Sequence, residues 1–132
     1  GYYTEKIFEQ VGRSFDLRVC VKNFPLANII TTKGIFEDLD FRGPVQPEYD
    51  IQLELEVTKP GVIDGFLVWL VLSTDETEVV DILEHQHSWL PVYLPVFDTS
   101  LEVRTGDRIS GMCRARLSTN QLNLDYEVSG VV

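Results

Sequence analysis

Both histidines of the chain and one of its two tryptophans lie in a single stretch, EHQHSWLPVYLPV, which runs from Glu84 to Val96. His85 and His87 stand two positions apart, so on an extended chain their side chains point to the same side, as two ligands of one metal ion require. Trp89 follows at the start of an apolar run, where an indole can form an aromatic wall for a cation or a planar group. The stretch therefore predicts either one wall of a binding site or an ordinary loop that leads into an edge strand.

A metal centre built on this histidine pair would need a third ligand, and the nearest candidates are Glu84 and Asp81. Because no further ligand is evident, we expect His85 and His87 to be loop histidines that face solvent. Other catalytic motifs are missing: the sequence has no GxGxxG after a strand, no GxxxxGKS or GxxxxGKT, and no GxSxG. The two cysteines lie far apart and lack metal-ligand spacing. We therefore assign no catalytic, cofactor-binding or metal-binding residue to the chain itself.

Composition and charge narrow the class of protein. A length of 132 residues suits a single domain with one core, and 44% hydrophobic with 24% charged residues is typical of a globular chain. The net charge of −10, from 21 acidic and 11 basic residues, argues against nucleic acid as a partner and permits basic peptides or protein surfaces. The longest apolar run, VIDGFLVWLVL, is too short to span a membrane, and no secretion signal is visible. We expect a cytoplasmic protein.

Hydrophobic periodicity predicts a fold made almost entirely of strands. Apolar and polar residues alternate in residues 15–21, 50–57, 109–117 and 122–128, which is typical of strands with one face in a core and the other in water. Residues 66–72 are apolar throughout, so we expect this strand to be covered on both faces.

Turn residues separate these strands. Residues 59–62 and 105–108 each carry a glycine where a tight reversal needs a positive φ, and Asn120 suits a left-handed turn between the last two strands. Gly12 ends a first segment whose apolar spacing is that of a short helix or turn. Both Pro91 and Pro95 lack an amide donor, which favours an edge or a bulged strand for residues 90–96.

One long acidic connection, residues 73–89, interrupts this pattern, and we expect a helical turn around Val79, Val80 and Leu83 within it. The chain is therefore predicted to be all-β. We expect one domain over residues 1–132, an antiparallel β-barrel or β-sandwich of about seven to nine strands. A short N-terminal helix or turn and the long loop at 73–89 complete it.

The order of segments resembles the C-terminal β-barrel of protein arginine methyltransferases. That barrel has a buried strand of the type HGFVAWFDV, a loop ending in Thr-His-Trp, an aromatic-rich strand, and a strand of the form VKxGExIxGxI. The matching segments here are GFLVWLVLS, HSWLPVYLPV, LEVRTGDRISGMCRARL and LNLDYEVSG, in that order. Upstream, FDLRVCVKN and TTKGIFEDLDF resemble the opening barrel strands, so the similarity covers about residues 14–130.

The resemblance implies a division of labour between two domains. In that family an N-terminal Rossmann-like domain binds S-adenosylmethionine, and the barrel supplies one wall of the acceptor cleft. By this resemblance Trp89, with His87 and His85, would bind substrate. The chain alone would then be inactive and hold no cofactor, as the C-terminal half of a larger methyltransferase. Its partners would be the cofactor domain and a basic protein or small-molecule methyl acceptor.

The sequence departs from the family pattern at several points. The cofactor domain and its pair of glutamates are not in it, and the motif reads His87-Ser88-Trp89, with the histidine one position early. Residues 22–32 are too short for the helical dimerisation arm that the family inserts between early barrel strands. A relative that methylates another acceptor fits the same plan. The alternative is a stand-alone β-sandwich module that binds a basic peptide or another small ligand.

Overall fold

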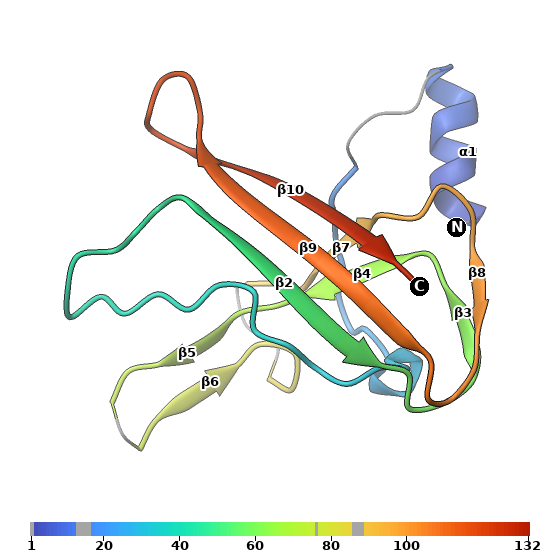
Figure 1. Cartoon of the computed structure of the whole chain (residues 1–132), viewed down its shortest axis with the longest axis horizontal. Helices are drawn as coiled ribbons and strands as arrows, with labels where there is room; N and C mark the ends of the chain where they lie inside the picture. The colour runs from blue at the N-terminus through green and yellow to red at the C-terminus, as the bar shows by residue number, and fades with distance from the viewer. Residues whose placement is uncertain (1, 13–16, 76, 86–88) are drawn as a thin grey trace. The chain divides into compact units, whose positions relative to one another are not determined.

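The structure, a computed structural model of the whole chain, describes residues 2–12, 17–75, 77–85 and 89–132 (Figure 1). Within these residues the chain forms antiparallel strands joined by turns, with one α-helix and one 3-10 helix. The predicted all-β antiparallel fold is confirmed. Two compact units make up the chain: the first comprises Gly1–Ile29 and Ile63–Leu101, and the second Ile30–Val62 and Glu102–Val132.

The described part of the chain holds ten strands that form no closed barrel, against about seven to nine expected. In chain order the elements are α1 (Tyr2–Val11), β1 (Val19–Cys20), η1 (Leu26–Asn28), β2 (Tyr49–Glu56), β3 (Gly61–Ile63), β4 (Gly65–Val68), β5 (Val71–Ser73), β6 (Val79–Asp81), β7 (Val92–Pro95), β8 (Leu101–Val103), β9 (Arg108–Leu117) and β10 (Leu124–Val131). No helix among the described residues is long and apolar enough to cross a membrane.

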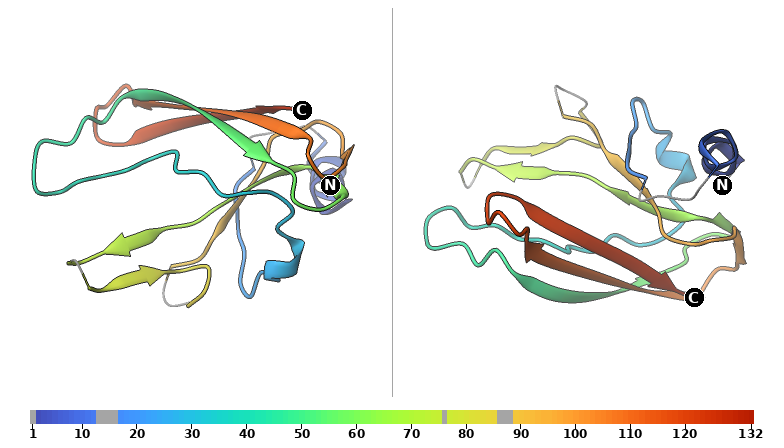
Figure 2. Two further views of the ribbon diagram at one scale, coloured as in Figure 1. Left: turned by 60° about the horizontal axis from the view of Figure 1, so that its bottom comes forward. Right: turned by 90° about the horizontal axis from the view of Figure 1, so that it is seen from above.

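A three-stranded sheet, ordered β10-β9-β2, is the centre of the second unit, and Figure 2 shows its strands side by side. In β2 and β10 half-buried and exposed residues alternate strictly, and β9 alternates between buried and more exposed ones along most of its length. These are the strands that period-two patterning predicts, because a pleated strand directs successive side chains to opposite faces. The inner face holds the best-buried side chains of the unit, among them Ile109, Cys113 and Ala115.

The outer face of this sheet carries a row of charges. Asp50, Arg114 and Glu127 lie directly opposite one another across the three strands. Arg114 Nε lies 3.2 Å from Asp50 Oδ1, and Arg114 Nη1 lies 3.3 Å from Glu127 Oε2. Arg116 also donates to both oxygens of Asp50, at 2.8 and 2.9 Å. Opposite charges facing each other across strands support the register of the sheet.

In the first unit, β7 is the middle strand of a sheet ordered β1-β7-β4. β7 is paired on both sides in an unbroken register, so the prediction of an edge or bulged strand for residues 90–96 is wrong. Pro91 precedes the first ladder residue, and its carbonyl accepts the amide of Val21 at 2.9 Å. Pro95 ends the strand opposite Gly65. The two prolines bracket β7, so they remove no amide from the interior of its ladders.

The apolar run of residues 66–72 is not one strand covered on both faces. β4 ends at Val68 and β5 starts at Val71, in a different sheet, where β5 pairs with β6. Leu70 is 41% exposed and Val71 50% exposed. A continuous apolar run therefore does not indicate one continuous strand. Here the strand ends at Val68, and the chain continues into a different sheet.

The acidic connection is shorter than expected, because β6 forms a hairpin with β5 within residues 73–89. Val79 and Val80 are strand residues, so the predicted helical turn is wrong for them, whereas Leu83 does lie in a turn, which the His85 amide closes by donating to the Asp81 carbonyl. At the hairpin tip Asp75 Oδ1 accepts the amides of Thr77 and Glu78, at 2.7 and 2.9 Å. This local capping by Asp75 favours a tight reversal.

Other local predictions have mixed outcomes. Gly12 ends α1 with a φ of +78°, and its amide bonds to the carbonyl of Phe8, as a helix stop should. Gly106 has a φ of +92° in the turn before β9, as predicted.

Two other turn predictions are wrong. Gly61 has no positive φ, and the left-handed residue in the last hairpin is Gln121 rather than Asn120. Residues 15 and 16 of the first predicted strand lie outside the described residues, and only Val19–Cys20 of it forms β1.

Candidate functional site

Trp89 lies on the connection between β6 and β7, and 57% of its surface is exposed. The chain is anchored on both sides of it, since Ile82 and Leu83 are buried before it and Pro91 is fully buried after it. Pro91 is also tied to the residue after β1 by the bond from the Val21 amide. The exposed indole lies two residues before a buried anchor, Pro91, where its faces are available for contact.

His85 is exposed and belongs to the turn that follows β6. Its amide donates to the carbonyl of Asp81 at 2.9 Å, and Asp81 Oδ1 accepts the amide of Leu83 at 2.9 Å. Asp81 therefore fixes the turn that presents His85 and the exposed Glu84. His87 lies outside the described residues, so the predicted histidine pair has no described geometry. Within the described ranges, no group of three His, Cys, Asp or Glu side chains is placed to hold a metal ion.

A hydrogen bond between Tyr93 and Asp64 holds the strand that follows Trp89. Tyr93 Oη donates to Asp64 Oδ1 at 2.5 Å, and the carbonyl of Asp64 accepts the amides of Val96 and Phe97 at 3.3 Å. Burial, and then this hydrogen bond, raises the pKa of the Tyr93 hydroxyl, so it stays protonated and donates at neutral pH. Asp64 thus fixes β7 and its continuation through both its side chain and its main chain.

In the second unit, one carboxylate joins two tyrosines of the sheet. Glu37 Oε1 accepts hydrogen bonds from Tyr49 Oη at 2.8 Å and from Tyr126 Oη at 3.0 Å. Both tyrosines lie directly opposite Ala115 of β9, one on each side of it. Because Ala115 is small and fully buried, the two rings can converge on the same carboxylate. The cluster ties the irregular segment before β2 to both edge strands of the sheet.

The electrostatics of this cluster keep the tyrosines neutral. Burial, followed by the hydrogen bond to Glu37, raises the pKa of Tyr126 to about 12. The same two causes raise the pKa of Tyr49 further. Burial, with a smaller contribution from the Glu37 charge, also raises the pKa of the Cys113 thiol. A thiol with a raised pKa is protonated at neutral pH and is a poor nucleophile. We therefore assign a structural role to Glu37 and its two tyrosines.

The cluster predicts a loss of stability in alkaline solution. Tyrosines whose folded-state pKa exceeds the unfolded value of about 10 stabilise the fold fully below pH 10, and this contribution falls as the pH rises toward 12. Urea unfolding at pH 9 and pH 11 should therefore show a drop in the free energy of unfolding. Tyr126→Phe should reduce that drop, because the substituted ring cannot ionise. An equal drop in the variant would contradict the assignment to Tyr126.

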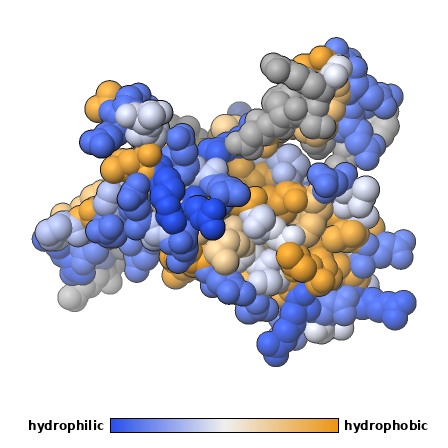
Figure 3. All heavy atoms as spheres, turned by 45° about the horizontal axis from the view of Figure 1, so that its top comes forward, coloured by the Kyte–Doolittle hydropathy of each residue, from blue (hydrophilic) through white to orange (hydrophobic). Residues whose placement is uncertain are grey.

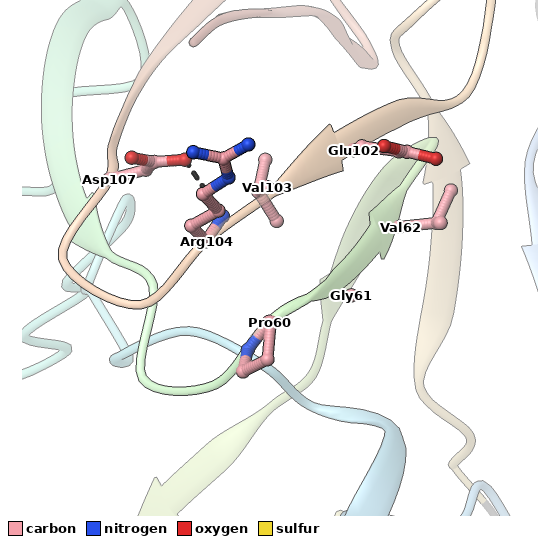
Figure 4. A pocket seen from close by; sticks show the side chains of 7 residues that line it. All are labelled: Pro60, Gly61, Val62, Glu102, Val103, Arg104 and Asp107. Atoms are coloured by element: carbon pink, nitrogen blue, oxygen red, sulfur yellow. Dashed lines mark hydrogen bonds between the residues drawn. The ribbon is translucent and has the colours of Figure 1, made fainter.

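An open hollow of about 620 Å³ lies on the second unit, beside the turn between β8 and β9. Figure 4 shows Glu102 next to Val62 on one side of it, and Arg104 next to Asp107 on the other. The turn is closed by reciprocal bonds, since the Arg104 amide donates to Asp107 Oδ2 at 2.8 Å and the Asp107 amide donates to the Arg104 carbonyl at 3.0 Å. The hollow can accept a small polar or cationic group.

Apolar side chains remain exposed on both units, and Figure 3 shows hydrophobic residues at the surface among hydrophilic ones. In the first unit they include Val71 and Val79, which share one face of the β5–β6 hairpin, together with Leu70 and Trp89. In the second unit Phe41 is 77% exposed between Asp40 and Arg42. Exposed apolar side chains of this kind are available for contact with another chain.

Sequence reasoning missed the Glu37 cluster and the Asp64–Tyr93 pair. Glu37 stands in a polar run without periodicity, so no local signal separates it from its acidic neighbours. The alternation of β2 and β10 does place Tyr49 and Tyr126 on inner faces, and a buried phenol needs a hydrogen-bond partner. The sequence thus indicated that acceptors were required, but it could not identify them.

No protein-family model matches the chain, and no curated protein matches it in sequence.

Proposed function

We propose that the chain is the acceptor-side β-domain of an S-adenosylmethionine-dependent methyltransferase, similar to the protein arginine methyltransferases and located in the cytoplasm. It would form one wall of the acceptor cleft, and a second, Rossmann-like domain would carry the cofactor. The ordered motifs over residues 14–130 suggest this role, and the exposed indole of Trp89 is the observation that carries it. A tryptophan that served only as core would be buried.

The proposed reaction needs little covalent chemistry from this chain. The cofactor domain would supply S-adenosylmethionine, whose methyl group would pass from sulfur to an acceptor nitrogen as the carbon–sulfur bond breaks, and the nitrogen would lose a proton to solvent. S-adenosylhomocysteine and the methylated acceptor would be the products. Catalysis therefore depends on placing the acceptor in line with the methyl group. In this scheme Trp89 and His85, with His87, orient the acceptor, and no residue of the chain is assigned to the cofactor.

The mechanical setting of Trp89 supports an orienting role. The β7 strand that follows it is paired on both sides, and Asp64 bonds to Tyr93 within that strand. The turn before it is anchored by buried Leu83. A cation held against an indole gains about 0.5–2 kcal/mol. The acidic charge of the chain also favours basic acceptors.

The division of labour can be tested by calorimetry with the chain of residues 1–132. We expect no binding of S-adenosylmethionine by this chain alone, and no methyl transfer to an arginine-containing peptide. The protein in which the chain is joined to its cofactor domain should bind the cofactor and methylate the peptide. Tight cofactor binding by the isolated chain would contradict the proposal, and so would a joined protein that binds cofactor but methylates no basic peptide or amine.

A stand-alone binding module is the second candidate, and the hollow beside β8 favours it. Glu102 and Asp107 place two carboxylates around this opening, against the single positive charge of Arg104, which leaves a net negative lining. Agmatine, an alkylguanidine, is a suitable probe for this site. Chemical-shift changes confined to residues 60–62 and 102–107, and abolished by Glu102→Gln, would favour the module. Absence of such chemical-shift changes at millimolar agmatine would contradict the binding-module hypothesis.

A further inference from the structure

The sheet of the second unit ends on an open edge. β10 is hydrogen-bonded to β9 on one side, and no strand within the described residues is bonded to its other side (Figure 1). The opposite edge is partly covered, because Thr32 and Glu56 exchange two hydrogen bonds. The Thr32 amide donates to the Glu56 carbonyl at 2.8 Å, and the Glu56 amide donates to Thr32 Oγ1 at 3.0 Å. β10 is therefore the edge to which a further strand can be added.

The register of the ladder determines which backbone groups of β10 point outward. The Ser118 amide donates to the carbonyl of Asn123 at 2.9 Å, and these two residues continue the β9–β10 register as a directly opposed pair. Bonded and non-bonded pairs alternate in an antiparallel ladder. Odd-numbered residues of β10 therefore bond to β9, and Leu124, Val128 and Gly130 direct their N–H and C=O groups away from it.

The same alternation of bonded and outward-pointing residues is found at the opposite edge of the sheet, in β2. Continuing the β2–β9 register, the Val57 amide donates to the carbonyl of Asp107 at 2.9 Å, so odd-numbered residues of β2 bond to β9. Even-numbered residues must then point outward. Glu56 does so, since its backbone bonds to Thr32 on the outer side. The alternation deduced for β10 thus holds where a neighbouring segment reveals it.

The charges beside this edge are acidic. Asp125 and Glu127 are exposed on the outer face of β10, and Asp125 makes no ion pair among the described residues. Arg116 lies opposite Asp125 in the register but binds Asp50 on the far side of the sheet. The free edge therefore carries two exposed carboxylates, of which Glu127 is paired with Arg114, whereas Arg116 is drawn toward β2.

These charges distinguish between possible occupants. A second copy paired along β10 would bring Asp125 and Glu127 of both chains together, and each chain carries a net charge of −10. Like charges that face each other across strands are destabilising. A basic strand meets the opposite situation, because its lysines or arginines would lie beside the two carboxylates. Its apolar residues would cover Leu124 and Val128, which are only half-buried.

We propose that β10 binds an extended, basic polypeptide segment as an added strand, through outward backbone groups at Leu124, Val128 and Gly130 and through the carboxylates of Asp125 and Glu127. Main-chain hydrogen bonds supply affinity in this mode, and alternate side chains supply specificity. The site is about eight residues long, the length of β10. It stands on the second unit alone and does not depend on the proposed methyltransferase role.

A synthetic peptide of eight residues, alternating lysine and valine with both ends blocked, is the probe. Calorimetry at low salt should show binding to residues 1–132, and NMR should show slowed exchange at the amides of Leu124, Val128 and Gly130. The same peptide with every amide N-methylated should not bind, because it cannot donate main-chain hydrogen bonds. A version with glutamate in place of lysine should not bind either, because of its charge.

Two substitutions separate the backbone from the charges. Val128→Pro removes an outward amide without removing a bond to β9, and it should weaken peptide binding about tenfold. The matched control Val128→Thr keeps the amide and should bind the peptide within about twofold of the native chain. Asp125→Asn combined with Glu127→Gln should weaken binding and reduce its salt dependence. If Val128→Pro fails to fold, the N-methylated peptide still tests the backbone contribution.

Several results would overturn the proposal. One is absence of binding by the lysine–valine peptide at millimolar concentration, and another is equal binding of its N-methylated form, which would indicate simple charge attraction. Exchange protection at other residues instead of β10 would place the site elsewhere. Sedimentation that revealed a dimer abolished by Val128→Pro, but not by Val128→Thr, would assign the edge to a second copy.

Discussion

Replacing Gly65 with alanine is expected to lower the free energy of unfolding by about 3 kcal/mol, the upper range for overpacking in a core. A Cβ at this position would overlap the carbonyl oxygen of Leu94 and lie 2.9 Å from Pro95 Cα. Both are backbone atoms of β7, so no side chain can move aside. Gly65 begins β4 directly opposite Pro95, and the two strands would have to separate at this point.

Urea unfolding at neutral pH, followed by circular dichroism, measures the effect, with Gly43→Ala as the matched control. A Cβ on Gly43 would have no atom within 4 Å, and this glycine has no positive φ. Its substitution should change stability by less than about 1 kcal/mol in either direction. Equal stability of Gly65→Ala and Gly43→Ala would show that β4 and β7 are not so closely spaced.

The close approach of β4 and β7 also explains where sequence reasoning about the first unit failed. The prolines around β7 suggested an edge or a bulged strand, because proline removes an amide donor. Pro91 and Pro95 instead lie just outside and at the end of the ladder, and Gly65 gives Pro95 the room it needs. Such compensation between residues 30 positions apart leaves no trace in local periodicity.

The second unit was more predictable, for a physical reason. β2, β9 and β10 each bury one face only, so their hydrophobic pattern has the period of the pleat and reveals both strand and face. Residues 66–72 lacked this alternation. Hydrophobicity alone could not locate the break between Val68 and Val71, nor predict that Val79 would belong to a strand that pairs with β5.

The candidate site shows the same contrast. The exposure of Trp89 agrees with its place at a junction of polar and apolar segments, and its role in binding stays a prediction. Glu37 could not be identified from sequence, because its importance arises from the convergence of Tyr49 and Tyr126 on either side of Ala115. Neighbouring residues in the sequence can indicate an exposed side chain such as Trp89. The hydrogen-bond partners of a side chain within a sheet depend on strand register, which the local sequence does not give.

In the proposed methyltransferase, Trp89→Ala should lower kcat/KM for a basic acceptor about tenfold, while the Kd for S-adenosylmethionine stays unchanged. The expected loss of about 1.4 kcal/mol is that of a cation held against an indole. Because the side chain is 57% exposed and its neighbours Leu83 and Pro91 provide the buried anchors, the fold should lose less than about 1 kcal/mol.

Controls separate an acceptor contact from a general loss of apolar surface. Trp89→Phe keeps an aromatic face and should restore most of the acceptor kinetics. Leu122→Ala, which truncates an 81% exposed apolar residue of the other unit, should have no effect. Methyl-transfer rates measured against acceptor concentration, together with cofactor calorimetry on each variant, provide the comparison. Unchanged acceptor kinetics in Trp89→Ala would contradict the proposed place of the indole in the acceptor cleft, because deleting a side chain that binds the acceptor must change the kinetics.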